Sequence, residues 1–116
     1  MNEAPMIDPA VLSELQDAAG HDFVVELVQT FAEEAPALLT ELRQAQHDHA
    51  ADRFRRAAHS LKSNSNTFGA TRLAELARTL ELGGMPAGTV ELDALDAEYA
   101  RTIAALETLA SEAPRG

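Results

Sequence analysis

The fold is decided by one stretch of the chain, which reads Ala57-Ala58-His59-Ser60-Leu61-Lys62-Ser63-Asn64-Ser65-Asn66-Thr67-Phe68-Gly69-Ala70. It contains the only lysine of the sequence, Lys62, one helical turn after His59. No acidic residue occurs between Arg53 and Ala74, although the formal net charge of the chain is −10 at pH 7. A basic segment centred on a histidine indicates a site for a phosphoryl group, because cationic side chains bind phosphate oxygens.

The spacing of apolar residues predicts a helix over residues 50–67, with Gly69 ending it and Phe68 packing its end into the core. At about 100° per residue, apolar and small side chains share one face. They are Phe54, Ala57, Ala58, Leu61 and Ser65. A second face, flanked by Ser63, collects Arg55, His59, Lys62 and Asn66. His59 is therefore predicted to point to the surface.

Four more helices are predicted around this one. Asp8 caps a short helix over 9–19, and Asp22 caps a helix over 22–46 whose apolar stripe stays in phase across Pro36. This phase predicts a single kinked helix. Thr71 caps the next helix, and the glycine-rich residues 83–88 separate it from the last one.

The expected fold class is all-α, an antiparallel up-down four-helix bundle with a short N-terminal lid helix. We expect one domain over residues 1–116, with residues 1–7 and 112–116 frayed.

Composition excludes several classes of function. The chain has no cysteine, which rules out disulfides and thiolate metal sites and favours a cytoplasmic location. The negative net charge argues against nucleic acid and anionic membranes as partners. His47 and His49 are two residues apart and do not share a helix face, so they indicate a solvated connection rather than a metal site. No metal and no cofactor are expected.

A lone histidine is most simply a solvated surface residue, but the surroundings of His59 favour chemistry. Its neighbours are cationic or small, which keeps the approach to the ring open. A neutral imidazole is a competent nucleophile near physiological pH. Lys62 can neutralise a phosphoryl group on the ring, and Ser63 or Asn66 can donate hydrogen bonds to it. The run Arg53, Arg55 and Arg56 is predicted to guide an acidic partner.

These residues match a known pattern. The run from Ala58 to Ser65, followed by Phe68-Gly69-Ala70, resembles the signature of histidine phosphotransfer (HPt) domains of bacterial phosphorelays. The resemblance extends to Glu33-Glu34-Ala35-Pro36, to the helix containing Leu73-Ala74-Glu75-Leu76 and to the glycine-rich break. One position departs from the family, which commonly has glycine directly after the lysine where this chain has Ser63.

The resemblance implies a phosphate carrier and not an enzyme. His59 would accept a phosphoryl group from an aspartate of one receiver domain and pass it to an aspartate of another. The receiver would supply metal and catalysis, and Lys62 would support the phosphate. The expected partners are receiver domains of response regulators and of a hybrid sensor histidine kinase, with the chain itself a monomer. The implied contact residues are Arg55, Arg56, Ser63, Asn66 and Gly69, with Phe31 or Glu34 from the kinked helix.

Two other classes of function remain open from the sequence. A non-transferring helical adaptor would bind a receiver or kinase without using the histidine. A hydrolase or metal-dependent bundle enzyme would need convergent carboxylates, and none is close to His59 in the sequence.

Overall fold

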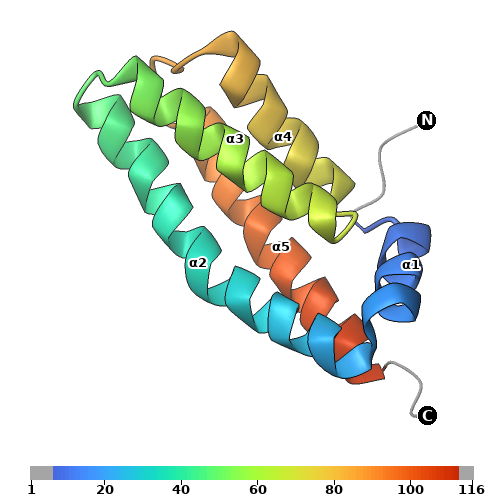
Figure 1. Cartoon of the computed structure of the whole chain (residues 1–116). Coiled ribbons are helices and arrows are strands. Elements are labelled where there is room, and N and C mark those ends of the chain that lie inside the picture. The colour runs from blue at the N-terminus through green and yellow to red at the C-terminus, as the bar shows by residue number, and fades with distance from the viewer. Residues whose placement is uncertain (1–6, 113–116) are drawn as a thin grey trace.

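The computed structural model describes residues 7–112 of the chain. This part forms helices only: α1 (Pro9–Ala19), α2 (His21–His47), α3 (Ala51–Thr67), α4 (Thr71–Gly83) and α5 (Val90–Glu112) (Figure 1). The all-helical prediction is confirmed. The ends predicted to fray lie mostly outside the described residues, while Ile7 packs against the core. None of the described helices combines the length and apolarity needed to cross a membrane.

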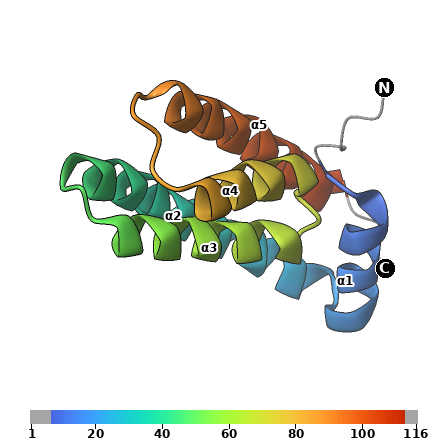
Figure 2. The same cartoon turned by 90° about the horizontal axis from the view of Figure 1, so that it is seen from above.

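Four helices enclose the core. The contacting pairs are α2–α3, α3–α4, α4–α5 and α2–α5, so each of these helices packs against two others. Viewed from above, the four run side by side and α1 lies at one end (Figure 2). α1 packs on α2 and meets the turn between α3 and α4, where the Asp8 N–H donates to the Gly69 carbonyl at 2.7 Å.

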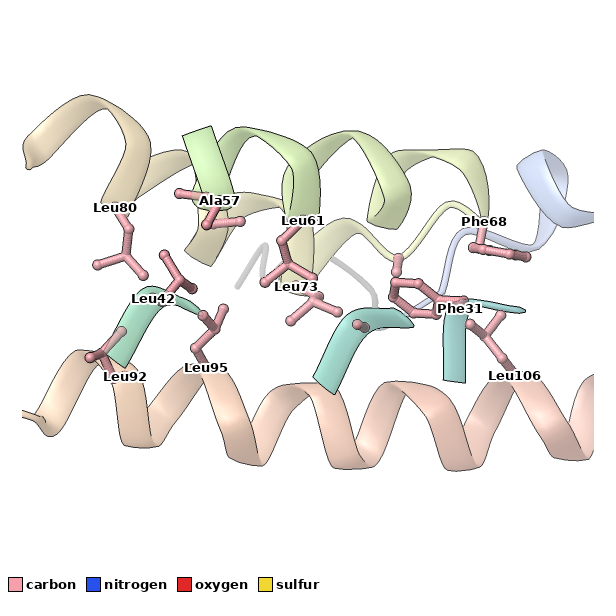
Figure 3. Packing of buried hydrophobic residues seen from close by; sticks show 14 of the residues in the cluster. Phe31, Leu42, Ala57, Leu61, Phe68, Leu73, Leu80, Leu92, Leu95 and Leu106 are labelled. Atoms are coloured by element: carbon pink, nitrogen blue, oxygen red, sulfur yellow. The ribbon is translucent and has the colours of Figure 1, made fainter. Parts of the chain in front are cut away.

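The face of α3 predicted to be apolar is buried over its whole length. Its members Phe54, Ala57, Ala58, Leu61 and Ser65 are all buried. Leu61 points between the helices toward Leu73 (Figure 3). Ser65 is the polar exception, and its hydroxyl donates to the Leu61 carbonyl at 2.7 Å. The buried hydroxyl is thereby satisfied, which removes most of the cost of burying it. The remaining positions of α3, including His59, lie outside the core.

α2 continues through Pro36 as one helix, as predicted. Proline has no N–H to donate to the carbonyl four residues earlier, which belongs to Ala32. The hydroxyl of Tyr99 on α5 donates to this carbonyl at 3.4 Å. The Tyr99 ring also lies edge-on to Phe31, with the two ring centroids 5.7 Å apart. α5 therefore supports α2 at the position where Pro36 removes a hydrogen bond of the helix.

The predicted helix starts are partly correct. Asp8 caps α1, because its Oδ1 accepts from the Ala10 N–H at 3.0 Å. Asp22 does not cap α2. Gly20, at a φ of 91°, ends α1 and directly precedes α2, so Asp22 falls inside the first turn. Thr71 does not cap α4 either, because its hydroxyl donates back to the Gly69 carbonyl at 3.1 Å.

Candidate functional site

His59 lies on the exposed face of α3, as the helical periodicity predicts. Its side chain is 56% exposed, while Ala58 and Leu61 on either side of it are fully buried. Lys62 follows one turn later on the same side of the helix, and its side chain is 24% exposed. The core thus fixes the helix from one side, and the imidazole is presented on the other.

A carboxylate from α4 joins the two side chains. The Oε2 of Glu81 lies 2.8 Å from His59 Nδ1, and its Oε1 lies 2.7 Å from Lys62 Nζ. Glu81 is only 13% exposed, so one carboxylate occupies the space between α3 and α4 beside the ring. Sequence reasoning missed Glu81, which is 22 residues from His59. The short turn between α3 and α4 is the signal that could have found it, since it sets which positions of the two helices face each other.

The charge state of Glu81 determines how His59 is oriented. The ammonium group of Lys62, followed by the imidazole of His59, lowers the pKa of Glu81 below its usual value. An ionised carboxylate only accepts hydrogen bonds, so Nδ1 of His59 is the donor in this pair. A neutral imidazole that keeps its proton on Nδ1 has its lone pair on Nε2. The arrangement therefore leaves the free lone pair of the ring on Nε2.

An open groove of about 430 Å³ runs beside the ring between α2 and α3. It is lined by Glu34, Ala37, Leu38, His59, Ser60, Ser63 and Asn64. A smaller hollow of about 220 Å³ shares Glu34 and Asn64 with it and extends toward Phe68. The groove gives a partner a way to approach the ring, and Ser63 forms part of its wall.

Comparison with known proteins agrees with this geometry. The family model of the Hpt domain matches residues 26–109, which include α3, α4 and the His59 site. The chain belongs to the Hpt domain family. Hpt domains are phosphocarrier modules of two-component phosphorelays and interact with receiver domains. The chain is therefore a histidine phosphotransfer domain of two-component signalling.

A solved structure supports the same assignment. The crystal structure of histidine-containing phosphotransfer protein B (HptB) from Pseudomonas aeruginosa PAO1 is similar with a TM-score of 0.73. The two sequences are 29% identical, and the similarity covers 95% of each chain. Among curated protein sequences, none matches this Hpt domain significantly.

Five residues predicted for the contact surface of the Hpt domain are exposed: Arg55, Arg56, Ser63, Asn66 and Glu34. Arg55 and Arg56 lie on α3 one turn before His59, and Asn66 lies two turns beyond it. Arg55 Nη2 lies 3.7 Å from Asp52 Oδ1, which is a weak pairing for two exposed groups. The structure does not bring Asn66 to the ring, because two helical turns separate them by about 10 Å.

Two other predicted contact residues are buried instead. Phe31 is 4% exposed and packs against Phe68, with the ring centroids 5.3 Å apart. Gly69 is buried where α1 crosses the turn between α3 and α4. Both serve the packing of the Hpt domain and have no surface to offer a partner, whereas Glu34 is exposed and lines the groove.

Arg53 does not belong to a free basic flank. Its Nε and Nη2 donate to the carboxylate of Glu41 on α2 at 2.8 and 3.1 Å, and its Nη1 donates to Asp48 at 3.0 Å. The guanidinium lowers the pKa of Glu41 through this paired hydrogen bond. Arg53 therefore links α3 to α2 and to the connection between them. The guiding role stays a prediction for Arg55 and Arg56.

Proposed function

We propose that this Hpt domain is a phosphorelay intermediate in which His59 receives and returns the phosphoryl group. The lone pair of Nε2 attacks the phosphorus of an aspartyl phosphate on one receiver, the P–N bond forms and the O–P bond breaks. The receiver aspartate leaves as a carboxylate. The reverse step on a second receiver restores His59. The observation that carries this proposal is the 2.8 Å contact between His59 Nδ1 and the Glu81 carboxylate, because a proton held on Nδ1 leaves the lone pair on Nε2, in a residue that lines the groove.

In this proposal, the receiver domain supplies the catalytic groups for the transfer, and His59 supplies the nucleophile. Phosphoryl transfer depends on positioning and on cations that neutralise the equatorial oxygens. Lys62 and His59 contact the same carboxylate, that of Glu81, so this cation lies beside the ring. The receiver would contribute the metal ion, and the chain would work as a carrier without a nucleotide or metal site of its own.

The groove between α2 and α3 is the proposed docking surface. It would accommodate receiver domains of response regulators and of a hybrid sensor histidine kinase, with Arg55 and Arg56 attracting their acidic pockets. Ser63 stands where the family commonly has glycine, and we expect its hydroxymethyl group to narrow access slightly while transfer is preserved. The proposal treats α2 to α5 as an antiparallel up-down bundle with α1 as a lid, in one monomeric cytoplasmic domain over residues 1–116.

A reconstituted relay tests the receiver-to-receiver step. A phosphorylated donor receiver is mixed with an acceptor receiver, with and without this chain. We expect phosphate on the acceptor only when the chain is present. Equal labelling of the acceptor without the chain would reject the carrier role. Binding of both receivers without any passage of phosphate would favour the adaptor.

Lys62→Ala is expected to slow phosphoryl transfer by about 10–100-fold, since a charge-assisted contact to the phosphate is worth about 1.5–3 kcal/mol. The bundle should remain folded because the lysine head group lies outside the core. Single-turnover transfer from a phosphorylated receiver measures the rate, and thermal unfolding is the control. A normal transfer rate in this variant would remove Lys62 from the site.

A further inference from the structure

We propose that Arg78 on α4 is a further contact residue for the receiver domain, and that Arg56 and Arg78 together attract the acidic pocket of the receiver onto His59 from two sides. This inference rests on the proposed docking of receivers at His59. It extends the docking surface from the groove between α2 and α3 across α3 to the exposed edge of α4, where the sequence pattern indicated no contact residue.

Arg78 is an exposed arginine whose charge is not neutralised by its neighbours. It makes no hydrogen bond or ion pair with any residue that the structure describes, although Glu75 lies three residues before it and Glu81 three residues after it. Glu81 is instead engaged by His59 and Lys62. The chain has 19 acidic residues and 9 basic ones, so an arginine left unpaired among them is available to an acidic partner.

Most other cations of the bundle are neutralised within it. Arg43, Arg53 and Arg101 each lie within 2.8 Å of a carboxylate oxygen on their own or a neighbouring helix. Arg56 resembles Arg78, because it is exposed and forms no hydrogen bond or ion pair with the described residues. Unpaired positive charge is therefore found on α3 and α4, the two helices that form the histidine site.

The two arginines bracket His59 along the bundle. Arg56 precedes His59 by three residues on α3, and Arg78 precedes Glu81 by three residues on α4. The turn at residues 68–70 sends α4 back alongside α3, so three residues earlier means opposite directions on the two helices (Figure 1). Because Glu81 contacts His59, the two arginines stand on opposite sides of the ring, about 10 Å apart along the helix axes.

The arginines also lie on different flanks of α3. Ser60 and Ser63 follow Arg56 by four and seven residues, which places all three on one helix face, and both serines line the groove toward α2. Arg56 therefore lies on the groove side. Arg78 belongs to α4, which packs on the other flank of α3. A line between the two guanidinium groups thus crosses the exposed face that presents His59.

A receiver pocket has the charge that this arrangement fits. A phosphorylatable aspartate that works with a metal ion needs further carboxylates to hold the metal. A guanidinium group stays charged at physiological pH and can donate two hydrogen bonds to one carboxylate. Charges at the rim of an interface mainly raise the association rate and orient the encounter. Arg78 should therefore affect how the receiver arrives and not the chemistry at His59.

The test measures how fast a metal-free receiver domain that binds the wild-type chain associates with variants of the full chain. Arg78→Gln is expected to associate about 2–5-fold more slowly at about 50 mM salt, and at the wild-type rate at about 500 mM salt, where exposed charges are screened. Arg78→Lys should keep most of the rate, because the charge remains. Thermal unfolding should be unchanged, since the side chain is exposed.

Ala104→Glu is the matched control, because it changes the net charge by the same single unit on the exposed side of α5, across the core from α3. Its association rate should stay close to that of the wild type. An unchanged rate for Arg78→Gln at low salt would overturn the inference, and so would equal slowing by Ala104→Glu, since only the net charge would then matter.

The binding measurement separates this inference from the proposed relay. A receiver that shows the expected rates but neither gives phosphate to His59 nor takes it would reject the relay and leave the docking role of Arg78 in place. Normal transfer through His59, together with unchanged association of Arg78→Gln, would reject the role of Arg78 alone.

Discussion

Leu61→Ala is expected to lower the free energy of unfolding by about 2–5 kcal/mol, the range for truncating a buried leucine. Leu61 is 0% exposed and reaches from α3 into the centre of the bundle, toward Leu73 (Figure 3). The substitution removes buried methyl groups and leaves a cavity that the surrounding helices can fill only in part. Chemical denaturation monitored by circular dichroism measures the change.

The neighbouring residue provides the matched control. Lys62→Ala alters the next position of the same helix, but its partner is Glu81, between α3 and α4, and not the apolar core. Its cost should be smaller, about 1–2 kcal/mol, because the substitution removes a partly buried ion pair but opens no cavity in the core. Equal destabilisation by the two variants would contradict the division of α3 into a buried face and a face for transfer.

Gly69→Ala is the second change with a large expected effect, a loss of about 2–4 kcal/mol of folding free energy. Gly69 has a φ of 68°, a conformation that residues with a Cβ adopt only at a cost in free energy. A Cβ there would also lie 2.8 Å from the Cβ of Val11 and 3.0 Å from the carbonyl oxygen of Asp8. α1 would have to shift away from the turn that it covers. Thermal unfolding of the variant measures the loss.

Gly84→Ala separates the two causes. Gly84 also has a positive φ, 84°, but a Cβ at this position would meet no atom within 4 Å. Gly84→Ala should therefore lose only the free energy of placing alanine at a positive φ, about 1–2 kcal/mol. If Gly69→Ala were no worse than Gly84→Ala, the close packing of α1 on the turn would not contribute to stability.

The position of His59 could be predicted because it follows from local periodicity. Five apolar or small residues on one face of α3 define the core side, and the ring must then lie on the other. The bounds of α1 were equally local, since Asp8, Pro9 and Gly20 specify both ends. Such features depend on a few adjacent residues and not on how helices pair.

The parts that could not be predicted depend on tertiary packing. Glu81 is one of many acidic residues in the chain, and only the register between α3 and α4 shows that it meets His59. Gly69 fits the family signature, which suggested a place on the contact surface, but α1 covers it. Arg53 looked like a free cation until α2 supplied Glu41. A sequence lists charges, whereas their pairing is set by helix register.

The identity of the phosphorylated atom is the central claim of this account, and labelling from a phosphorylated receiver tests it most directly. The wild-type chain should take up one acid-labile phosphoryl group, located on Nε2 of His59 by phosphorus–proton NMR. His59→Gln should remain folded and take up none, because the ring is exposed and contributes little to the core. Label that persists in His59→Gln, or label found on another residue of the wild type, would contradict the account.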